Sequence, residues 1–198
     1  MSTYDQILVE AFDLFAELGF EGTSVQFIAG KVGIKAASLY AHFKGKDEIF
    51  HVCLAKALRD WDDFGTKAIE QALGQASASE AATNLIMAFD GLLKTSKAYR
   101  FWTRVYVFPP EIITDAEKAA MGDVDNRFFD QLLSFSRKIL PPATDGRTVL
   151  NFAVGLVSLL TGFLINAGGQ PLDPMTVNSC VALLVNGAKA GPGEVSVM

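Results

Sequence analysis

The chain is poor in the residues on which catalysis and metal binding most often depend. Its 198 residues include two histidines, His42 and His51, and two cysteines, Cys53 and Cys180. The cysteines lie far apart in apolar helical patterns without CxxC or metal-ligand spacing, so we interpret them as reduced thiols of a cytoplasmic protein. A glycine-rich phosphate loop and a nucleophile elbow are also absent. We therefore expect no metal, no cofactor and no enzymatic activity, and keep an all-α enzyme only as an alternative.

Positive charge is scarce and unevenly distributed. The formal net charge is -5 and the sequence pI is about 5.0, which excludes a uniformly basic surface but not a local basic patch. No arginine precedes Arg59, whereas residues 22–46 contain four lysines and no acidic residue. This stretch, called the basic segment below, therefore carries a charge of +4 and is equipped to contact phosphate groups.

Charge of either sign is missing from residues 148–172. This stretch is long enough for a membrane span of about 20 residues. It also contains polar residues and glycines, so we favour a helix buried by neighbouring helices, including those of a partner chain, over a membrane span. The acidic residues near the N-terminus do not fit a basic signal peptide, and we expect a cytoplasmic protein with no membrane partner.

Strand-like alternation is absent as well, and helical spacing predicts an all-α chain of about nine helices. We expect a DNA-binding helix-turn-helix domain of about three helices at residues 1–48. An effector-binding and dimerisation body follows at residues 49–191, and then a flexible tail at residues 192–198. The predicted helices cover residues 7–18, 25–32, about 36–43, 47 to about 72, 80–95, 97–108, 113–140 with a possible break near 121–122, 144–167 and 174–189.

Two short helices joined by Gly33, Ile34 and Lys35 have the layout of a helix-turn-helix. Gly33 permits the left-handed backbone that such a turn often needs, and Ile34 and Leu39 can anchor the second helix. The first residues of a recognition helix meet base edges in the major groove. Spacing alone leaves open an ordinary three-helix packing unit with solvated lysines.

Spaced motifs across the first quarter of the chain are more specific. They are AxxLF at 11–15, GFEGTSV at 19–25, IA at 28–29, GI at 33–34 and LYAHFKxK at 39–46. Residues 7–50 thereby resemble the N-terminal domain of the TetR family of transcriptional regulators. The resemblance implies a homodimeric, ligand-responsive, sequence-specific DNA-binding regulator, which we expect to be a repressor released from a double-stranded DNA operator by a small hydrophobic or aromatic effector.

The resemblance also implies which residues meet DNA. Tyr40 and Lys46 would bind phosphates, although Tyr40 could instead be a packing ring and His42 a surface residue without a contact. Phe27 stands where the family usually has a charged residue. The full DNA-binding set is Thr23, Ser24, Gln26, Lys35, Ala36, Ser38, Tyr40, His42, Lys44 and Lys46.

In the body, aromatic and polar side chains at helical spacing are candidates for an effector pocket, although each could equally belong to the core. They are Trp61, Phe64, Asn84, Phe89, Arg100, Phe101, Trp102, Arg104, Tyr106, Phe128 and Phe152. Small and apolar residues of the last two helices predict a four-helix dimer interface about a twofold axis. They are Gly155, Ser158, Leu159, Gly162, Phe163, Ser179, Ala182, Leu183 and Asn186. A TetR-like helical protein without operator specificity, acting as an interaction or membrane-surface module, remains the main alternative function.

Overall fold

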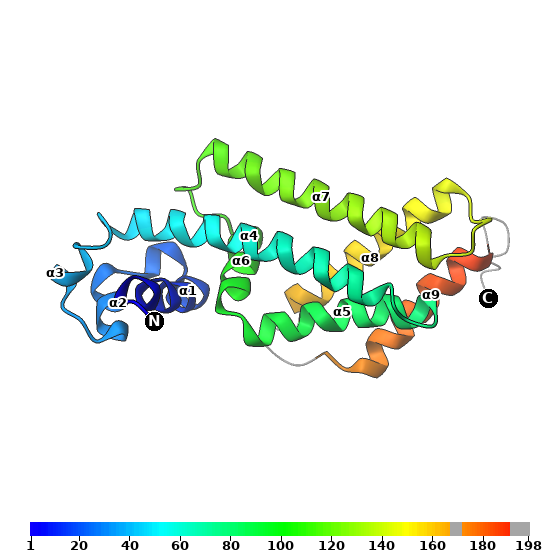
Figure 1. Cartoon of the computed structure of the whole chain (residues 1–198), viewed down its shortest axis with the longest axis horizontal. Coiled ribbons are helices and arrows are strands. Elements are labelled where there is room, and N and C mark those ends of the chain that lie inside the picture. The colour runs from blue at the N-terminus through cyan, green and yellow to red at the C-terminus, as the bar shows by residue number, and fades with distance from the viewer. Residues whose placement is uncertain (167–171, 191–198) are drawn as a thin grey trace. The chain divides into compact units, whose positions relative to one another are not determined.

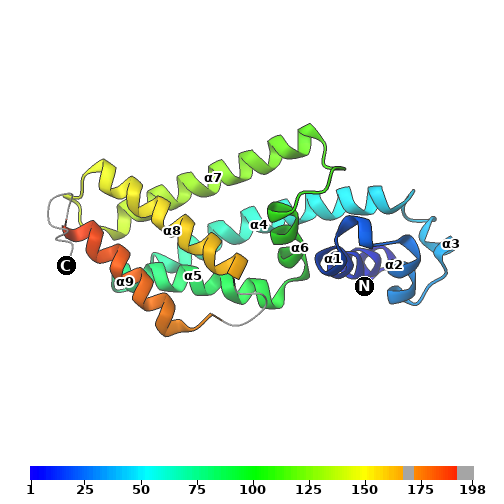
Figure 2. The same ribbon diagram turned by 180° about the vertical axis from the view of Figure 1, so that it is seen from behind.

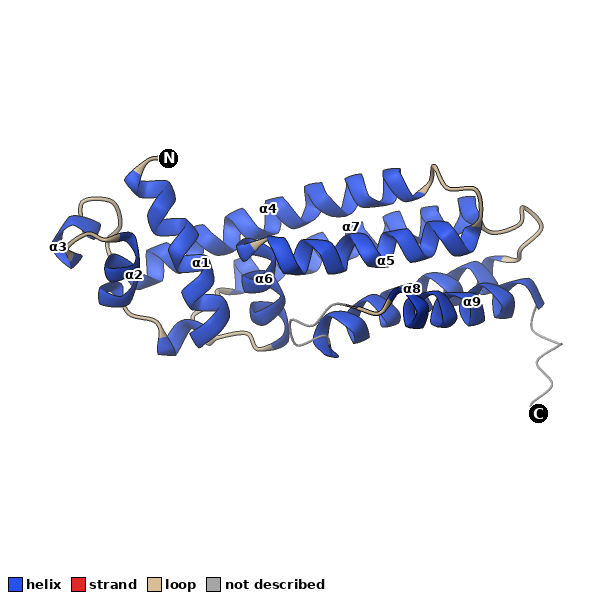
Figure 3. Ribbon diagram, turned by 90° about the horizontal axis from the view of Figure 1, so that it is seen from below, coloured by secondary structure: helices blue, strands red, loops and turns tan. Residues whose placement is uncertain are grey.

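The fold is all helical across the part of the chain that the structure describes. The computed structural model describes residues 1–166 and 172–190, and these contain helices and no strand (Figures 1 and 3). The helices are α1 (Thr3–Gly22), α2 (Val25–Val32), α3 (Ala36–Leu39), α4 (Lys46–Ala72), α5 (Ala78–Thr95), α6 (Lys97–Val107), α7 (Asp115–Ile139), α8 (Gly146–Asn166) and α9 (Pro174–Ala190). The predicted all-α class and its nine helices are confirmed within these residues. The tail predicted at 192–198 lies outside them.

Several predicted boundaries differ from the structure, most by one or two residues. The third helix ends at Leu39 and not near Phe43, because the backbone nitrogens of His42 and Phe43 both turn back to the Leu39 carbonyl, at 2.9 and 3.0 Å. α7 runs through residues 121–122 without a break. α1 begins earlier than predicted, since Ser2 and Asp5 form a capping box that satisfies free amides of its first turn.

α1 changes direction near its end. Gly19 has φ 76° and ψ 177°, a conformation that is essentially restricted to glycine. The sequence predicted that the helix stops at this residue. The structure shows a kink followed by a last turn to Gly22.

The chain divides into two compact units, which are described separately below. Unit 1 comprises Met1–Asp62 and Thr95–Gly122, and unit 2 comprises Asp63–Lys94 and Asp123–Met198. α6 and the first turns of α7 therefore group with the N-terminal helices. A functional boundary at residue 48 stays a prediction, because compactness does not show where a DNA-binding part ends.

Aromatic rings fill the core of unit 1. Phe50 lies 5.4 Å from Phe15 and 5.5 Å from Phe101, measured between ring centroids, and Phe101 lies 5.4 Å from Phe12. All four side chains are buried. Because they come from α1, α4 and α6, this cluster fixes the three helices against one another.

Unit 2 contains a second aromatic group and a helical hairpin. The Phe89 ring contacts Phe64 and Phe128 in edge-on geometry, at 5.1 and 5.5 Å between centroids. α8 and α9 pack against each other in the same unit (Figure 2).

Candidate DNA interface and dimer face

The helix-turn-helix layout predicted from sequence is present in unit 1. The Ser24 hydroxyl caps α2 by accepting from the Phe27 nitrogen at 3.1 Å. Gly33 ends α2 with φ 79° and ψ 25°, and the Ile34 nitrogen then donates to the Ala29 carbonyl at 3.0 Å. Lys35 precedes α3, so the turn is short and its geometry depends on a left-handed glycine.

Buried side chains hold this turn in place. Leu39 and Phe43 are buried, and the Tyr4 ring of α1 stacks on Phe43 with 4.8 Å between centroids. Ile28 of α2 is also fully buried. α3 has only four residues, so its position depends on these contacts more than on its own backbone bonds.

Most of the predicted DNA-binding residues lie on the surface of this motif. The exposed members are Gln26, Lys35, Ser38, Tyr40, His42 and Lys44, and the partly exposed members are Ser24, Ala36 and Lys46. Tyr40 is 55 % exposed, which argues against the alternative of a packing ring. Lys31 of the basic segment is exposed as well.

Thr23 does not fit its predicted role. It is only 2 % exposed, and its hydroxyl donates to the Gly19 carbonyl at 2.7 Å. The side chain therefore stabilises the kinked end of α1. Ser24 is the neighbouring hydroxyl that remains nearer the surface.

Lys46 is committed to an internal contact. Its Nζ donates to the Phe20 carbonyl at 2.8 Å and lies 3.9 Å from the centroid of the Phe20 ring. The lysine joins the last turn of α1 to the first residue of α4. Its predicted phosphate contact is untested, and the structure gives the side chain a positioning role instead.

Phe27 was noted in the sequence only as a departure from the family pattern. It is 56 % exposed on α2, close to Ser24 and Gln26. Exposure is the signal that adds it to the candidate interface, and helical periodicity alone did not provide that signal.

Comparisons with known proteins agree with this geometry. The sequence model described as "Bacterial regulatory proteins, tetR family" matches residues 7–53, which contain the whole helix-turn-helix. The HTH-type transcriptional repressor KstR2 of Mycolicibacterium smegmatis is 36% identical over 88 residues, 44% of this chain and 41% of that protein. The biofilm operon icaADBC HTH-type negative transcriptional regulator IcaR of Staphylococcus epidermidis is 38% identical over 60 residues, 30% of this chain and 32% of that protein. The matches thus span about a third to two fifths of these curated relatives.

Solved structures extend the likeness to the remaining helices. The TetR family transcriptional regulator PfmR from Thermus thermophilus superposes with a TM-score of 0.68 at 24% identity, covering 94% of this chain and 97% of that one. AibR, in complex with isovaleryl coenzyme A and operator DNA, superposes with a TM-score of 0.66 at 17% identity, covering 93% and 98%. At these identities the likeness shows the fold. Residues 7–53 belong to the TetR family of bacterial regulatory proteins, and the described helices share the fold of its solved members.

The effector residues predicted for this TetR-family chain are divided between the two units. Unit 1 holds Trp61, Arg100, Phe101, Trp102, Arg104 and Tyr106, and unit 2 holds Phe64, Asn84, Phe89, Phe128 and Phe152. Phe89, Phe101 and Phe152 are fully buried, and Phe101 belongs to the aromatic core of unit 1. Asn84 and Tyr106 are exposed, so helical spacing did not identify only buried residues, and it could not separate core from cavity.

One polar candidate, Arg100, forms an ion pair within unit 1. Arg100 Nη2 pairs with Asp13 Oδ1 at 2.8 Å. Burial raises the pKa of the Tyr99 hydroxyl, whose ring stacks on Trp61 at 5.1 Å between centroids. In the part of the chain that the structure describes, no group of three His, Cys, Asp or Glu side chains has metal-binding geometry.

The predicted dimer residues lie on a partly apolar face of α8 and α9. Ser158, Ser179, Leu183 and Asn186 are exposed, and Leu159, Gly162, Phe163 and Ala182 are partly exposed. Leu183 is 75 % exposed, and Leu150 and Val154 on α8 are further exposed apolar residues. The TetR-family chain therefore presents apolar side chains to the surface on both helices.

Gly155 has a role within the chain. A Cβ atom at this residue would lie 2.5 Å from Leu184 Cδ1, so the glycine allows α8 to approach α9 of the same chain. Its place in a dimer interface stays a prediction. A Cβ atom at Gly162 would instead meet open space, which is compatible with the predicted approach of a partner there.

One described helix passes a length and composition test for membrane spanning. It covers Gly146–Phe163, with a mean hydropathy of 1.3 and 28% of the window buried. This segment contains the α8 residues on which the dimer prediction depends.

Proposed function

We propose that this TetR-family chain is a homodimeric, sequence-specific DNA-binding transcriptional regulator, a repressor that a small hydrophobic effector releases from its operator. The observation that carries the proposal is the surface of the basic segment. Lys31, Lys35 and Lys44 are exposed around α2 and α3, Tyr40 lies among them, and no acidic residue interrupts the segment. A net charge of -5 is compatible with this role because the positive charge is local.

Within this proposal the exposed residues divide into two groups. Lys31, Lys44 and the Tyr40 hydroxyl contact phosphates and so position the domain without reading sequence. Lys35 and Ser38 reach base edges from the start of α3. Small side chains such as Ala36 allow the helix to approach thymine methyl groups closely.

The dimer follows from the apolar face of α8 and α9. Leu183, together with Leu150 and Val154, supports burial against a second copy. A twofold dimer brings two DNA-binding motifs to half-sites one helical turn apart, about 34 to 36 Å between centres. Changing Leu183 to Asp places a charge in that contact, and we expect light scattering to report a monomer. A Leu183→Asp protein that stays dimeric would contradict this interface.

An effector is supported by the aromatic content of the chain and by its structural neighbours. AibR was solved with isovaleryl coenzyme A and operator DNA together. FadR from Bacillus subtilis, with a TM-score of 0.61 at 21% identity, was solved with stearoyl-CoA. We therefore extend to this chain the binding of a ligand that carries an apolar group.

The proposal is tested by selecting operator sequences from random DNA and titrating the best one against salt. Three exposed lysines in each of two protomers give about six phosphate contacts, and a slope of log K against log salt of about -5. The affinity should then fall about 10³-fold between 50 and 200 mM salt. Tyr40→Phe removes two hydroxyl bonds per dimer, about 1 kcal/mol each, and should weaken all sequences about 30-fold.

Lys67→Gln is the matched control, because Lys67 is an exposed lysine of α4 outside the basic segment. This change should leave the slope of log K against log salt unchanged. A folded dimer that shows no sequence-selective binding at low salt would refute the regulator. Recovery of that protein with lipid vesicles would support the membrane-surface alternative.

A further inference from the structure

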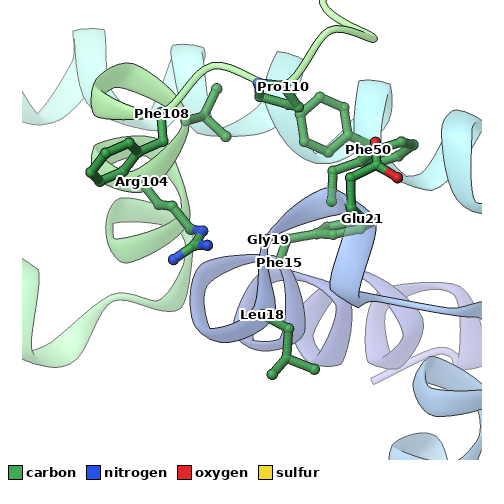
Figure 4. A pocket seen from close by; sticks show the side chains of 10 residues that line it. Phe15, Leu18, Gly19, Glu21, Phe50, Arg104, Phe108 and Pro110 are labelled. Carbon is green, nitrogen blue, oxygen red and sulfur yellow. The ribbon is translucent and has the colours of Figure 1, made fainter.

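Unit 1 contains a pocket of about 170 Å³ that shares only Arg104 with the predicted effector set (Figure 4). It lies between the end of α1, the start of α4 and the end of α6. Its walls are mostly apolar, and Phe15, Phe20, Phe50 and Phe108 contribute aromatic rings. Two charged side chains, Arg104 and Glu21, also line it.

Arg104 is the last cation in a row on α6. The first, Lys97, pairs with Asp13 and, at 3.5 Å, with Glu10, and the second, Arg100, pairs with Asp13. Among the described residues, the Arg104 side chain makes no ion pair or hydrogen bond.

The kink of α1 explains why Arg104 has no acidic partner on that helix. A Cβ atom at Gly19 would lie 2.9 Å from Arg104 Nη2, so the guanidinium lies directly against the glycine. Glu17 has the α1 spacing that matches Arg104, but its side chain is exposed and forms no ion pair with a described residue. A guanidinium that forms no ion pair in the described part of the chain therefore lines this pocket, together with Glu21 (Figure 4).

We propose that this pocket binds a small carboxylate with a single ring or a short alkyl chain, and that it is the effector site of the regulator. A cavity of about 150 Å³ accommodates benzene, so 170 Å³ suits one ring or a chain of similar size. A guanidinium binds a carboxylate through two parallel hydrogen bonds. The nearby Glu21 disfavours a ligand with a second negative charge.

The pocket is connected directly to the start of α4. Phe20 lines the pocket, and its carbonyl and ring both contact Lys46 Nζ, the first residue of that helix. A ligand that moves Phe20 therefore acts on the joint that follows the basic segment. This assignment as an effector site rests on the proposed regulator function.

Calorimetric titration of the full-length protein tests the pocket without DNA. The probes are benzoate and hexanoate, each compared with its neutral amide, benzamide or hexanamide. We expect each acid to bind at least tenfold more tightly than its amide, since a hydrogen bond to a charged group is among the stronger ones. Arg104→Gln should abolish this preference, and Glu21→Gln should increase it several-fold.

Arg100→Gln is the matched control, because that guanidinium already pairs with Asp13, and it should change the preference less than twofold. Thermal melts confirm that each variant is folded. Equal binding of acid and amide by the wild type would contradict a carboxylate site in this pocket. A preference for the acid that is retained in folded Arg104→Gln would contradict it as well. Carboxylate binding that leaves operator affinity unchanged would overturn its assignment as the effector site. Absence of operator binding before any ligand is added is a separate result, which refutes the proposed function and not the pocket.

Discussion

Replacing Gly19 with Ala tests the kink on which both the Thr23 contact and the pocket depend. The backbone at Gly19 has φ 76° and ψ 177°, a region that costs a residue with a Cβ atom about 1–3 kcal/mol. The new Cβ would also lie 2.9 Å from Arg104 Nη2, which a flexible side chain can relieve by moving. Alanine lowers the entropy of the unfolded chain and returns about 0.4–1 kcal/mol.

The net loss should therefore be about 1–2 kcal/mol. For a chain of this size, 1 kcal/mol corresponds to a shift of about 2–4 °C in Tm, so Gly19→Ala should lower Tm by about 2–8 °C. The measurement is thermal unfolding followed by circular dichroism at one fixed protein concentration, since dimerisation makes Tm depend on concentration.

Two other glycines of unit 1 provide controls within the same motif. Gly30 lies inside α2 with open space around it, so Gly30→Ala should stabilise the protein by about 0.5–1 kcal/mol. Gly33 is left-handed but also in open space, so Gly33→Ala should cost about 1–2 kcal/mol from the backbone alone. A Gly19→Ala protein as stable as Gly30→Ala would refute the argument that the kink requires glycine.

Two further predictions concern contacts of α4. Lys46→Met keeps the apolar stem but removes the donor to the Phe20 carbonyl, so it should lower Tm. The slope of log K for DNA binding against log salt should stay unchanged. A slope smaller by about two would instead reveal a phosphate contact in each protomer. Burial alone would raise the pKa of Glu117, but hydrogen bonds from Thr114 and His51 outweigh burial and lower the pKa from 4.5. This carboxylate therefore stabilises the fold above about pH 4.5, and its contribution is lost as pH falls below that value. Glu117→Gln should therefore reduce the loss of stability as pH falls below about 4.5 in denaturant titrations, and an unchanged profile would contradict the role of this contact.

Local signals in the sequence were sufficient to predict the helix-turn-helix. Ser24 and Gly33 were identified as the start and end of α2, and the structure shows the hydrogen bond and the left-handed backbone that each supplies. These features depend on neighbours within a few residues. The early end of α3 was not predicted. The Leu39 carbonyl accepts from backbone nitrogens of a turn that has no strong sequence signature.

Long-range contacts limited the prediction of individual site residues. Thr23 and Lys46 match the family pattern, yet their polar atoms bind the Gly19 and Phe20 carbonyls. Phe101 has the spacing of a buried face, and sequence does not reveal which other rings share that burial. The pocket was missed for the same reason, because it combines residues from α1, α4 and α6.

The acidic residues of α1 can be reconciled with DNA binding by the same row of α6 cations. Glu10 and Asp13 belong to the helix that packs beside the motif, and their charges are met by Lys97 and Arg100. Hydrogen bonding to Asp13 raises the pKa of Lys97, so this lysine remains charged at neutral pH. A paired acid exerts a weaker field at the basic segment than an unpaired one, and ions in solution screen the remainder beyond about 8 Å. The α6 cations therefore stabilise the contact with α1 and also preserve the positive potential that the proposed DNA interface requires.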